Sequence, residues 1–243
     1  MVYGVILAAG IGSRMKSKTK KQFMLLKNKP VFYYSVEKFL KIKNIDKIIL
    51  VINDKDKDSK IIKDFIKKYK CKIYNEIIYL ITGGKERYDS VYNAITFIKS
   101  IYEISNNDKI IIHDSARPNV DINDIKKLIS YIDKYKVVTL SYKLTDTIKK
   151  TKHKNEYLNE VIKTLDRDEY SLITTPQGFN LKTLNSAYEK FIKNMKKIKI
   201  TDDLQIIENF SKVRTYTLNC NKNNIKITTK EDLDVLKCII KGL

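Results

Sequence analysis

The stretch at residues 7–23, LAAGIGSRMKSKTKKQF, combines two glycines with one arginine and several lysines. Gly10 and Gly12 let the backbone approach a phosphate and turn its N–H groups inward. Arg14 and Lys21 would add a forked donor and a point charge, which together stabilise the negative charge that develops on an attacked α-phosphate. No Gly-Lys-Ser/Thr follows, which excludes a Walker loop. A turn followed by solvated lysines explains the stretch equally well.

The cations of the chain are mostly lysines, which makes its few arginines informative. The formal net charge is +20, and the 48 basic residues comprise 43 Lys and five Arg. This charge predicts an anionic partner. Where lysine is the default cation, an arginine indicates a position that needs a planar, bidentate donor. The five arginines are Arg14, Arg87, Arg117, Arg167 and Arg214.

A second stretch, IIHDSARP at residues 111–118, places a carboxylate at the end of an apolar run. A carboxylate among cations at the end of a strand is a natural Mg²⁺ ligand that bridges to phosphates, and Asp114 is our candidate. A helix cap or an ion pair with Arg117 explains the same carboxylate. His113 has two interpretations, a general base and a packed histidine, and we favour the second.

A third stretch, GGKERYDSV at residues 83–91, begins with a glycine pair. Gly83 and Gly84 indicate a tight turn, and Ser90 falls on the helix that we expect to follow. Recognition of a base or a ribose is one interpretation of this stretch. The other is the start of a helix without a ligand.

Alternating strands and helices must position these three stretches. β-branched apolar runs predict strands, and apolar residues at helical spacing predict helices. The alternation with short connections predicts an α/β fold with a mostly parallel sheet flanked by helices. The predicted strands are Tyr3–Ala8, Lys47–Ile52, Lys72–Ile81, Lys109–Ile112, Val137–Tyr142 and Val213–Leu218. The predicted helices are Val31–Leu40, Ser59–Tyr69, Glu86–Ile101, Ile122–Tyr135, Leu181–Lys193, residues 200–210, and a last one with Thr229 as its N-cap and Asp232 in a capping box.

The three candidate stretches all follow predicted strands. In an open α/β sheet, ligands bind beyond the carboxyl ends of the strands. We therefore expect the Gly10 loop, the glycine pair and Asp114 to converge on one crevice.

Residues 143–172 interrupt the alternation. Two short strand-like runs, near Thr145–Lys150 and Tyr157–Lys163, flank a polar tip. The pattern predicts a hairpin that projects from a single domain spanning residues 1–243. Because a two-stranded arm is marginally stable alone, we expect it to pack on a second subunit.

Composition bears on several classes of protein. The apolar run Val5–Ala9 is too short to span a membrane, and no charged region precedes it as in a signal peptide. The three cysteines are far apart and show no metal-ligand spacing, which indicates reduced thiols in a cytoplasmic protein. Arginine and aromatic residues do not cluster in one basic stripe, so we expect no nucleic-acid partner.

Taken in order, the motifs resemble one family. LAAGIGSRM…KQF, GGKERYDSV, HDSARP, TDT, LDR…TTPQGF, ITDD and NIKITTKEDL occur in the order and approximate spacing of the 2-C-methyl-D-erythritol 4-phosphate cytidylyltransferases. The resemblance covers residues 3 to about 241. It implies a Rossmann-like nucleotidyltransferase fold and a homodimer joined through a β-arm. The implied reaction is the Mg²⁺-dependent transfer of the cytidylyl group from CTP to 2-C-methyl-D-erythritol 4-phosphate with release of pyrophosphate, in the non-mevalonate isoprenoid pathway.

The resemblance also implies a role for individual residues. Arg14, Lys21 and Lys226 would hold the phosphates and stabilise the transition state, and Asp114 would bind the metal. Thr147 and Arg167 on the arm would bind the sugar phosphate of the neighbouring subunit, in a site that Arg117 and Thr175 help to shape. The residues implied for the cytidine pocket are Ala8, Ala9, Gly10, Gly12, Gly84, Lys85 and Ser90. One departure is Ser115, which stands where the family commonly has alanine.

Two alternatives to this function remain at this point. Ribitol-5-phosphate cytidylyltransferases share the fold and most motifs, and physics does not separate two C5 polyol phosphates here. LDR and ITDD look more like the methylerythritol enzymes. The second alternative is a non-catalytic nucleotide- or nucleic-acid-binding protein. The charges of Arg14, Lys21, Asp114 and Lys226 argue against it, because the displacement needs each of them.

Overall fold

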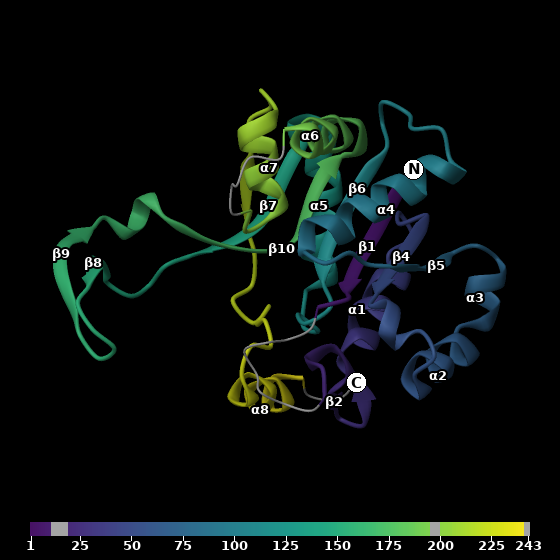
Figure 1. Ribbon diagram of the computed structural model, residues 1–243, viewed down its shortest axis with the longest axis horizontal. Helices are drawn as coiled ribbons and strands as arrows, with labels where there is room; N and C mark the ends of the chain where they lie inside the picture. Colours follow the sequence, from purple (N-terminus) through teal and green to yellow (C-terminus); the bar gives the residue numbers. More distant parts are fainter. Residues whose placement is uncertain (11–18, 195–199, 241–243) are drawn as a thin grey trace.

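A computed structural model describes residues 1–10, 19–194 and 200–240 of the 243-residue chain. Its centre is a seven-stranded sheet with the order β11-β7-β10-β6-β1-β4-β5 (Figure 1). β10 runs antiparallel to both of its neighbours, and the other strand pairs of the sheet are parallel. The mostly parallel α/β sheet that the sequence predicts is confirmed. The strands are β1 Val2–Ala8, β4 Lys47–Ile52, β5 Ile78–Thr82, β6 Lys109–Asp114, β7 Val137–Lys143, β10 Ser171–Asn180 and β11 Tyr216–Asn219.

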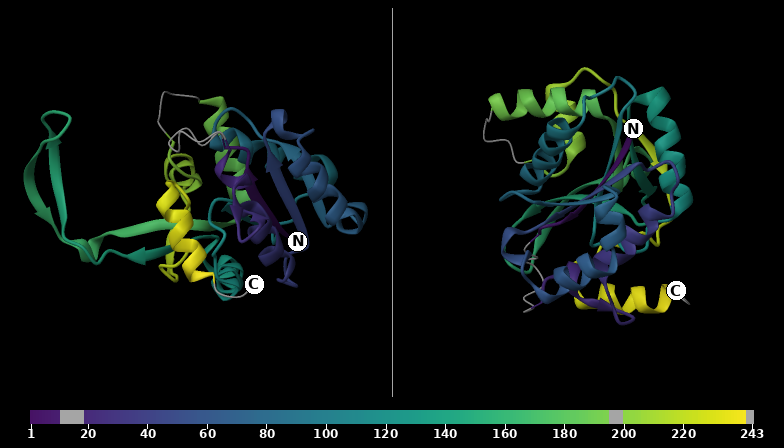
Figure 2. Two further views of the ribbon diagram at one scale, coloured as in Figure 1. Left: turned by 90° about the horizontal axis from the view of Figure 1, so that it is seen from below. Right: turned by 90° about the vertical axis from the view of Figure 1, so that its right-hand side faces the viewer.

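Helices cover both faces of this sheet (Figure 2). On one face, α1 (Val31–Leu40), α2 (Lys60–Lys68) and α5 (Ile122–Tyr135) pack apolar side chains into one core cluster. On the other, α4 (Arg87–Ile101), α6 (Leu181–Lys193) and α7 (Asp203–Phe210) build a second cluster. In each helix the apolar side chains recur every three or four residues, so one face meets the sheet.

A third, smaller cluster holds the last helix in place. α8 (Lys230–Ile239) packs Leu236 against Leu26 and Tyr34, near the two-stranded ribbon of β2 (Leu25–Leu26) and β3 (Lys29–Pro30). The predicted capping box at Thr229 and Asp232 starts this helix. Ile227, in the segment before α8, belongs to the same cluster and fixes the position of its neighbour Lys226.

Two parts of the predicted secondary structure are wrong, and β11 begins at Tyr216, three residues after the predicted start at Val213. Lys72–Ile81 is not one strand, because α3 (Lys70–Tyr74) continues the preceding helix and β5 begins only at Ile78. Glu76, with a φ of 55°, makes the turn between the two. The second error is an omission, since β10 passes through TTPQGF, where the sequence analysis placed no strand.

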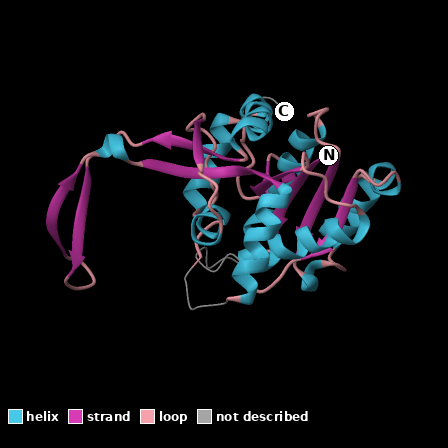
Figure 3. Cartoon of the chain, turned by 90° about the horizontal axis from the view of Figure 1, so that it is seen from above, coloured by secondary structure: helices cyan, strands magenta, loops and turns pink. Residues whose placement is uncertain are grey.

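The arm projects away from the sheet (Figures 1 and 3). It consists of β8 (Ile148–His153) and β9 (Asn159–Leu165), about two to three residues further along the chain than predicted, and a short turn of helix, η4 (Arg167–Glu169). Apolar side chains on it are exposed, with Tyr157 at 89%. Among the described residues, no helix is long and apolar enough to cross a membrane.

Candidate active site

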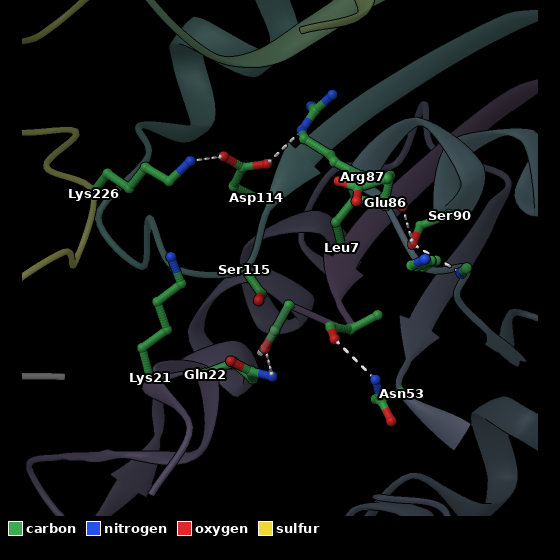
Figure 4. A pocket seen from close by; sticks show the side chains of 15 residues that line it. Leu7, Lys21, Gln22, Asn53, Glu86, Arg87, Ser90, Asp114, Ser115 and Lys226 are labelled. Atoms are coloured by element: carbon green, nitrogen blue, oxygen red, sulfur yellow. Dashed lines mark hydrogen bonds and ion pairs between the residues drawn. The ribbon is translucent and has the colours of Figure 1, made fainter. Parts of the chain in front are cut away.

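The three candidate stretches meet at the carboxyl edge of the parallel strands, as predicted. A pocket of about 260 Å³ opens there, beyond the ends of β1 and β6 (Figure 4). Gly12 and Arg14 lie outside the described residues. The pocket is lined by Leu7, Ala9, Gly10, Lys21, Gln22, Asn53, Gly84, Lys85, Glu86, Arg87, Ser90, Asp114, Ser115, Ala116 and Lys226.

A buried glutamine shapes the start of the glycine loop. Nε2 of Gln22 donates hydrogen bonds to the carbonyls of Ala8 (2.7 Å) and Gly10 (2.9 Å). Its side chain is only 1% exposed. Gln22 had no role in the predictions from the sequence, because the backbone carbonyls that it contacts carry no sequence signal. The side chain of Ala8 packs in the core and does not line the pocket.

The glycine pair is needed for close packing against the next helix. A Cβ on Gly83 would lie 2.6 Å from Cβ of Ala9, and one on Gly84 would lie 2.2 Å from Cβ of Asp89. The N–H of Gly84 donates to Oγ of Ser90 (3.1 Å). The stretch therefore starts α4, as one interpretation has it, and Gly84, Lys85 and Ser90 also line the pocket, while recognition of a base or a ribose stays a prediction.

Asp114 lies between two cations at the end of β6. Nε of Arg87 donates to its Oδ1 (3.3 Å), and Nζ of Lys226 donates to its Oδ2 (2.6 Å). Burial alone would raise the pKa of Asp114, but these two cations outweigh it and hold the pKa well below its usual range. The ion pairs are formed with Arg87 and Lys226, whereas the sequence analysis considered one with Arg117.

Arg87 had no predicted role, although its guanidinium contacts two carboxylates. Its Nη1 donates to Oδ2 of Asp203 (2.6 Å), so one guanidinium joins two carboxylates. Burial would lower the pKa of Arg87, but Asp203 and Asp114 outweigh it and raise the pKa above its ordinary value. The rarity of arginine was the signal for Arg87, while Asp203 lies 116 residues away in the chain.

Neighbouring lysines in the opening stretch have different surroundings. Lys21 begins the short helix η2 (Lys21–Phe23) and lines the pocket. Nζ of Lys20 forms an ion pair with both oxygens of Asp56, at 2.6 and 2.7 Å. Lys20 is therefore paired with a carboxylate and not merely solvated, whereas the role of Lys21 on a phosphate stays a prediction.

A second pocket, of about 350 Å³, adjoins the first. Arg87, Asp114 and Lys226 line both pockets. The predicted residues Arg117 and Thr175 line the second one. The other residues that line it are Ile173, Thr174, Gln177, Thr201 and Asp202.

Buried hydrogen bonds connect the second pocket to the end of β6. Oγ1 of Thr175 accepts from the N–H of Asp114 (3.1 Å), and Nη1 of Arg117 donates to the carbonyl of Asn224 (2.8 Å). Ser115 is buried beside them and lines the first pocket. These contacts fix the backbone on which the Asp114 carboxylate stands.

The two predicted arm residues are not brought to the pockets of their own chain. Thr147 and Arg167 are exposed and line neither pocket. Nη1 of Arg167 donates to the carbonyl of Thr145 at the base of the arm. The arm points away from the sheet (Figure 1), so these residues lie apart from both pockets of their own chain.

His113 is the packed histidine that the sequence analysis favoured. It is fully buried, with Nε2 3.1 Å from the carbonyl of Arg117 and Nδ1 3.2 Å from Oγ1 of Thr175. Burial lowers its pKa to about 3. A neutral, enclosed imidazole of this kind is a structural group and not a general base.

This burial predicts a loss of stability in acid. An unfolded histidine has a pKa of about 6.5, so the unfolded chain binds a proton below that pH while the folded chain does not. The folded pKa is lowered, so stability falls as the pH drops from 6.5 towards 3. We expect the free energy of unfolding to fall by about 2 kcal/mol from this residue between pH 7 and pH 5. Urea titrations at the two pH values measure the fall.

The only other histidine gives a matched control for this prediction. His153 is exposed on the arm. His153→Gln should show the same fall in stability as the unaltered chain, and His113→Gln should lose most of it. An equal fall in both variants would contradict the assignment. Carboxylates whose pKa is lowered in the folded chain, such as Asp114, also reduce the free energy of unfolding in acid. They do so only below about pH 4, the pKa of such groups in the unfolded chain.

Comparison with known proteins identifies a family for this chain. The family model described as 2-C-methyl-D-erythritol 4-phosphate cytidylyltransferase matches residues 2–242. A protein of that name from Clostridium botulinum (strain ATCC 19397 / Type A) is 38% identical over 240 residues, which cover 98% of this chain and 97% of the relative. One from Clostridium beijerinckii is 34% identical over 243 residues, the full length of both.

Solved structures agree as well. The crystal structure of 4-diphosphocytidyl-2C-methyl-D-erythritol synthase from Anaerococcus prevotii has a TM-score of 0.80 at 28% identity, covering 99% of this chain and 96% of that one. The 2-C-methyl-D-erythritol 4-phosphate cytidylyltransferase of Francisella tularensis has a TM-score of 0.75 at 31% identity, covering 98% of each chain. The chain therefore belongs to the 2-C-methyl-D-erythritol 4-phosphate cytidylyltransferase family.

Proposed function

We propose that this chain transfers the cytidylyl group of CTP to 2-C-methyl-D-erythritol 4-phosphate and releases pyrophosphate, a step of the non-mevalonate isoprenoid pathway. The observation that carries the proposal is the wall shared by the two pockets. Arg87, Asp114 and Lys226 line both, so two phosphorylated molecules would meet across one set of charges. Family membership supplies the identity of the two substrates.

The chemistry suits such a wall. The attacking group is a phosphate that is already ionised, so the reaction needs no strong general base. The main task is to hold two polyanions in line against their mutual repulsion. A site for that task is rich in cations, and His113, buried without access to the pockets, fits a reaction that uses no histidine.

The residues divide between the two substrates as follows. In the first pocket, Gly10, Gly84, Lys85 and Ser90 would bind the nucleotide, with Lys21 on its phosphates. Lys226, between the pockets, would reach both the α-phosphate and the attacking phosphate. Arg14 and Gly12, which lie outside the described residues, keep the roles that the resemblance implies.

Asp114 is the described residue that fits a divalent cation. The described residues contain no group of three or more His, Cys, Asp or Glu side chains that could hold one. Mg²⁺ commonly binds through one or two carboxylates together with substrate phosphates and water, and one carboxylate between two pockets suits that mode. When bound, the cation would neutralise charge on the phosphates. The carboxylate would need to release Arg87 or Lys226 to hold it.

The arm would complete the acceptor site of a second subunit. Its exposed apolar side chains, including Tyr157 and Val161, fit an interface between two copies of this chain. Thr147 and Arg167 at its base would then contact the sugar phosphate bound by the partner. The homodimer, the cytoplasmic location and the absence of a nucleic-acid partner stay predictions.

Arg167→Ala tests the role of the arm. The variant should raise the KM for the sugar phosphate about tenfold or more, because a charge-assisted contact with that substrate is lost. The KM for CTP should change less than twofold, since CTP binds in the other pocket. Steady-state kinetics with each substrate varied in turn measure the two constants. Equal increases in both would contradict this role.

Release of pyrophosphate tests the function as a whole. Purified protein with CTP and Mg²⁺ should release pyrophosphate when 2-C-methyl-D-erythritol 4-phosphate is added, and none without an acceptor. Release with ribitol 5-phosphate alone would overturn the assignment in favour of a ribitol-5-phosphate cytidylyltransferase. If no pyrophosphate is released with either acceptor, the chain is a binding protein that has kept the fold.

A further inference from the structure

The two cations that hold Asp114 are anchored very differently. Arg87 has a second carboxylate partner, Asp203, at 2.6 Å. Asp203 is fully buried, and its other oxygen accepts from the hydroxyl of Tyr188 at 2.6 Å. Arg87 is therefore fixed from behind by a buried, fully hydrogen-bonded acid, since both oxygens of Asp203 are engaged.

Lys226 lacks such an anchor in the part of the chain that the structure describes. Its Nζ has one hydrogen-bond partner there, Oδ2 of Asp114, and its side chain is 33% exposed at the junction of the two pockets. A phosphate that enters either pocket offers Lys226 several oxygens. The lysine ammonium, on a flexible stem, turns towards a new partner at low cost.

Arg87 also connects the chain segments that carry the two pockets. It is the first residue of α4, directly after Gly84, Lys85 and Glu86 of the nucleotide pocket. Asp203 is the first residue of α7, directly after Thr201 and Asp202 of the second pocket. The ion pair thus ties the start of one helix to the start of the other, behind the shared wall (Figure 4 shows Arg87 beside Asp114).

We infer that Arg87 is a positioning residue: anchored by Asp203, it keeps hold of Oδ1 of Asp114 when substrate phosphates draw Lys226 away from Oδ2. This inference rests on the proposed function for the identity of the substrates. Lys226 changes partner, and Oδ2 becomes available to a ligand. The carboxylate stays aimed because Arg87 does not move. The nucleotide and acceptor segments keep their spacing through the same guanidinium.

A crystal structure of the unaltered protein with CTP and no acceptor is the first test. Arg87 should still contact both Asp114 and Asp203, and Nζ of Lys226 should lie on a phosphate oxygen. Nη2 of Arg87 is buried without a hydrogen-bond partner among the described residues. It is therefore the group that would bind a phosphate if Arg87 were itself a ligand. If Arg87 turns this group to the phosphates and leaves Asp114, it is a ligand and the inference fails. Because this test needs no acceptor, its result does not depend on whether the proposed acceptor is the right one.

Variants supply the second test, with CTP binding by calorimetry to count competent sites. Per CTP-binding site, Arg87→Gln should lower kcat about 100-fold, because an error of about 1 Å in a reacting group has effects of that size. Asp203→Asn should lower kcat about tenfold. The kcat of Arg87→Lys should be at least fivefold higher than that of Arg87→Gln. The KM for each substrate should change less than threefold in all of them. A rise in the KM for either substrate with kcat unchanged would overturn the inference.

Two controls separate positioning from general damage to the fold. Lys99, also on α4, forms an exposed ion pair with Glu189 at 2.8 Å, and Lys99→Gln should leave kcat unchanged. The double variant Arg87→Gln/Asp203→Asn should lose little more than Arg87→Gln alone, because residues that act as a unit are not additive. Losses that multiply would show that the two residues act independently and would overturn the inference.

Discussion

Lys21→Ala should lower kcat at least 100-fold and leave the fold intact. Lys21 lines the first pocket, where in the proposed function its ammonium would meet the negative charge that develops on the phosphates. Loss of one donor that stabilises such a transition state costs about 10²–10³ in kcat. The KM for CTP should rise less than kcat falls, because the charge that Lys21 meets is largest in the transition state. Single-turnover rates at saturating substrate give the effect directly.

Lys20→Ala is the matched control for that variant. Lys20 is adjacent in sequence and has the same charge, but its Nζ is held by Asp56 at 2.6 Å. Its removal should change kcat less than twofold. Near-normal turnover in Lys21→Ala, or equal losses in both variants, would contradict the assignment of the catalytic charge to Lys21.

Lys226→Ala should have the second large effect, again 100-fold or more in kcat. Lys226 is the one lysine that lines both pockets among the described residues, so its charge would be shared by the attacking phosphate and the attacked phosphate. Its loss should also raise the KM for both substrates, which distinguishes it from Arg167 on the arm. Asp114 keeps its contact with Arg87 in this variant, so the melting temperature should change little.

Lys222→Ala serves as its control, since Lys222 lies four residues earlier in the same segment and is exposed. The control should keep its kcat and both KM values. An equal loss of activity in the two variants would mean that the segment, and not the charge at Lys226, supports turnover. The expected result is a fall in kcat and a rise in both KM values in Lys226→Ala, with neither change in Lys222→Ala.

Much of the sheet and its helices could be predicted because their signals are local. Lys47–Ile52, Ile122–Tyr135 and Leu181–Lys193 have the predicted bounds, since a β-branched run or an amphipathic spacing with a cap specifies each of them. The convergence of Gly10, Gly84 and Asp114 followed from the rule that ligands bind beyond parallel strand ends.

The features that sequence reasoning missed depend on contacts between distant residues. β10 contains Pro176 and Gly178, which indicate a loop when read alone, yet pairing with β6 and β7 makes the segment a strand. A Cβ on Gly178 would lie 2.7 Å from Cδ1 of Ile132, so this glycine lets α5 approach the sheet. No local pattern reports either contact.

The residues of the site show the same difference between local signals and distant contacts. Asp114 and Lys21 were predicted from motif and charge and Lys226 from the family resemblance, and the structure brings all three to one pocket. Arg87 was noticed only as a rare arginine, because its partner Asp203 is far away in the chain. Gln22 was missed because its bonds go to backbone carbonyls, which carry no sequence signal.

A competition between two acceptors tests the central claim most directly. The protein would receive limiting CTP, Mg²⁺ and equal concentrations of 2-C-methyl-D-erythritol 4-phosphate and ribitol 5-phosphate, and mass spectrometry would quantify the two CDP-linked products. The ratio of products equals the ratio of the two kcat/KM values. The account predicts that CDP-methylerythritol exceeds CDP-ribitol by at least 100-fold. A product mixture dominated by CDP-ribitol, or no CDP-linked product from either acceptor, would contradict it.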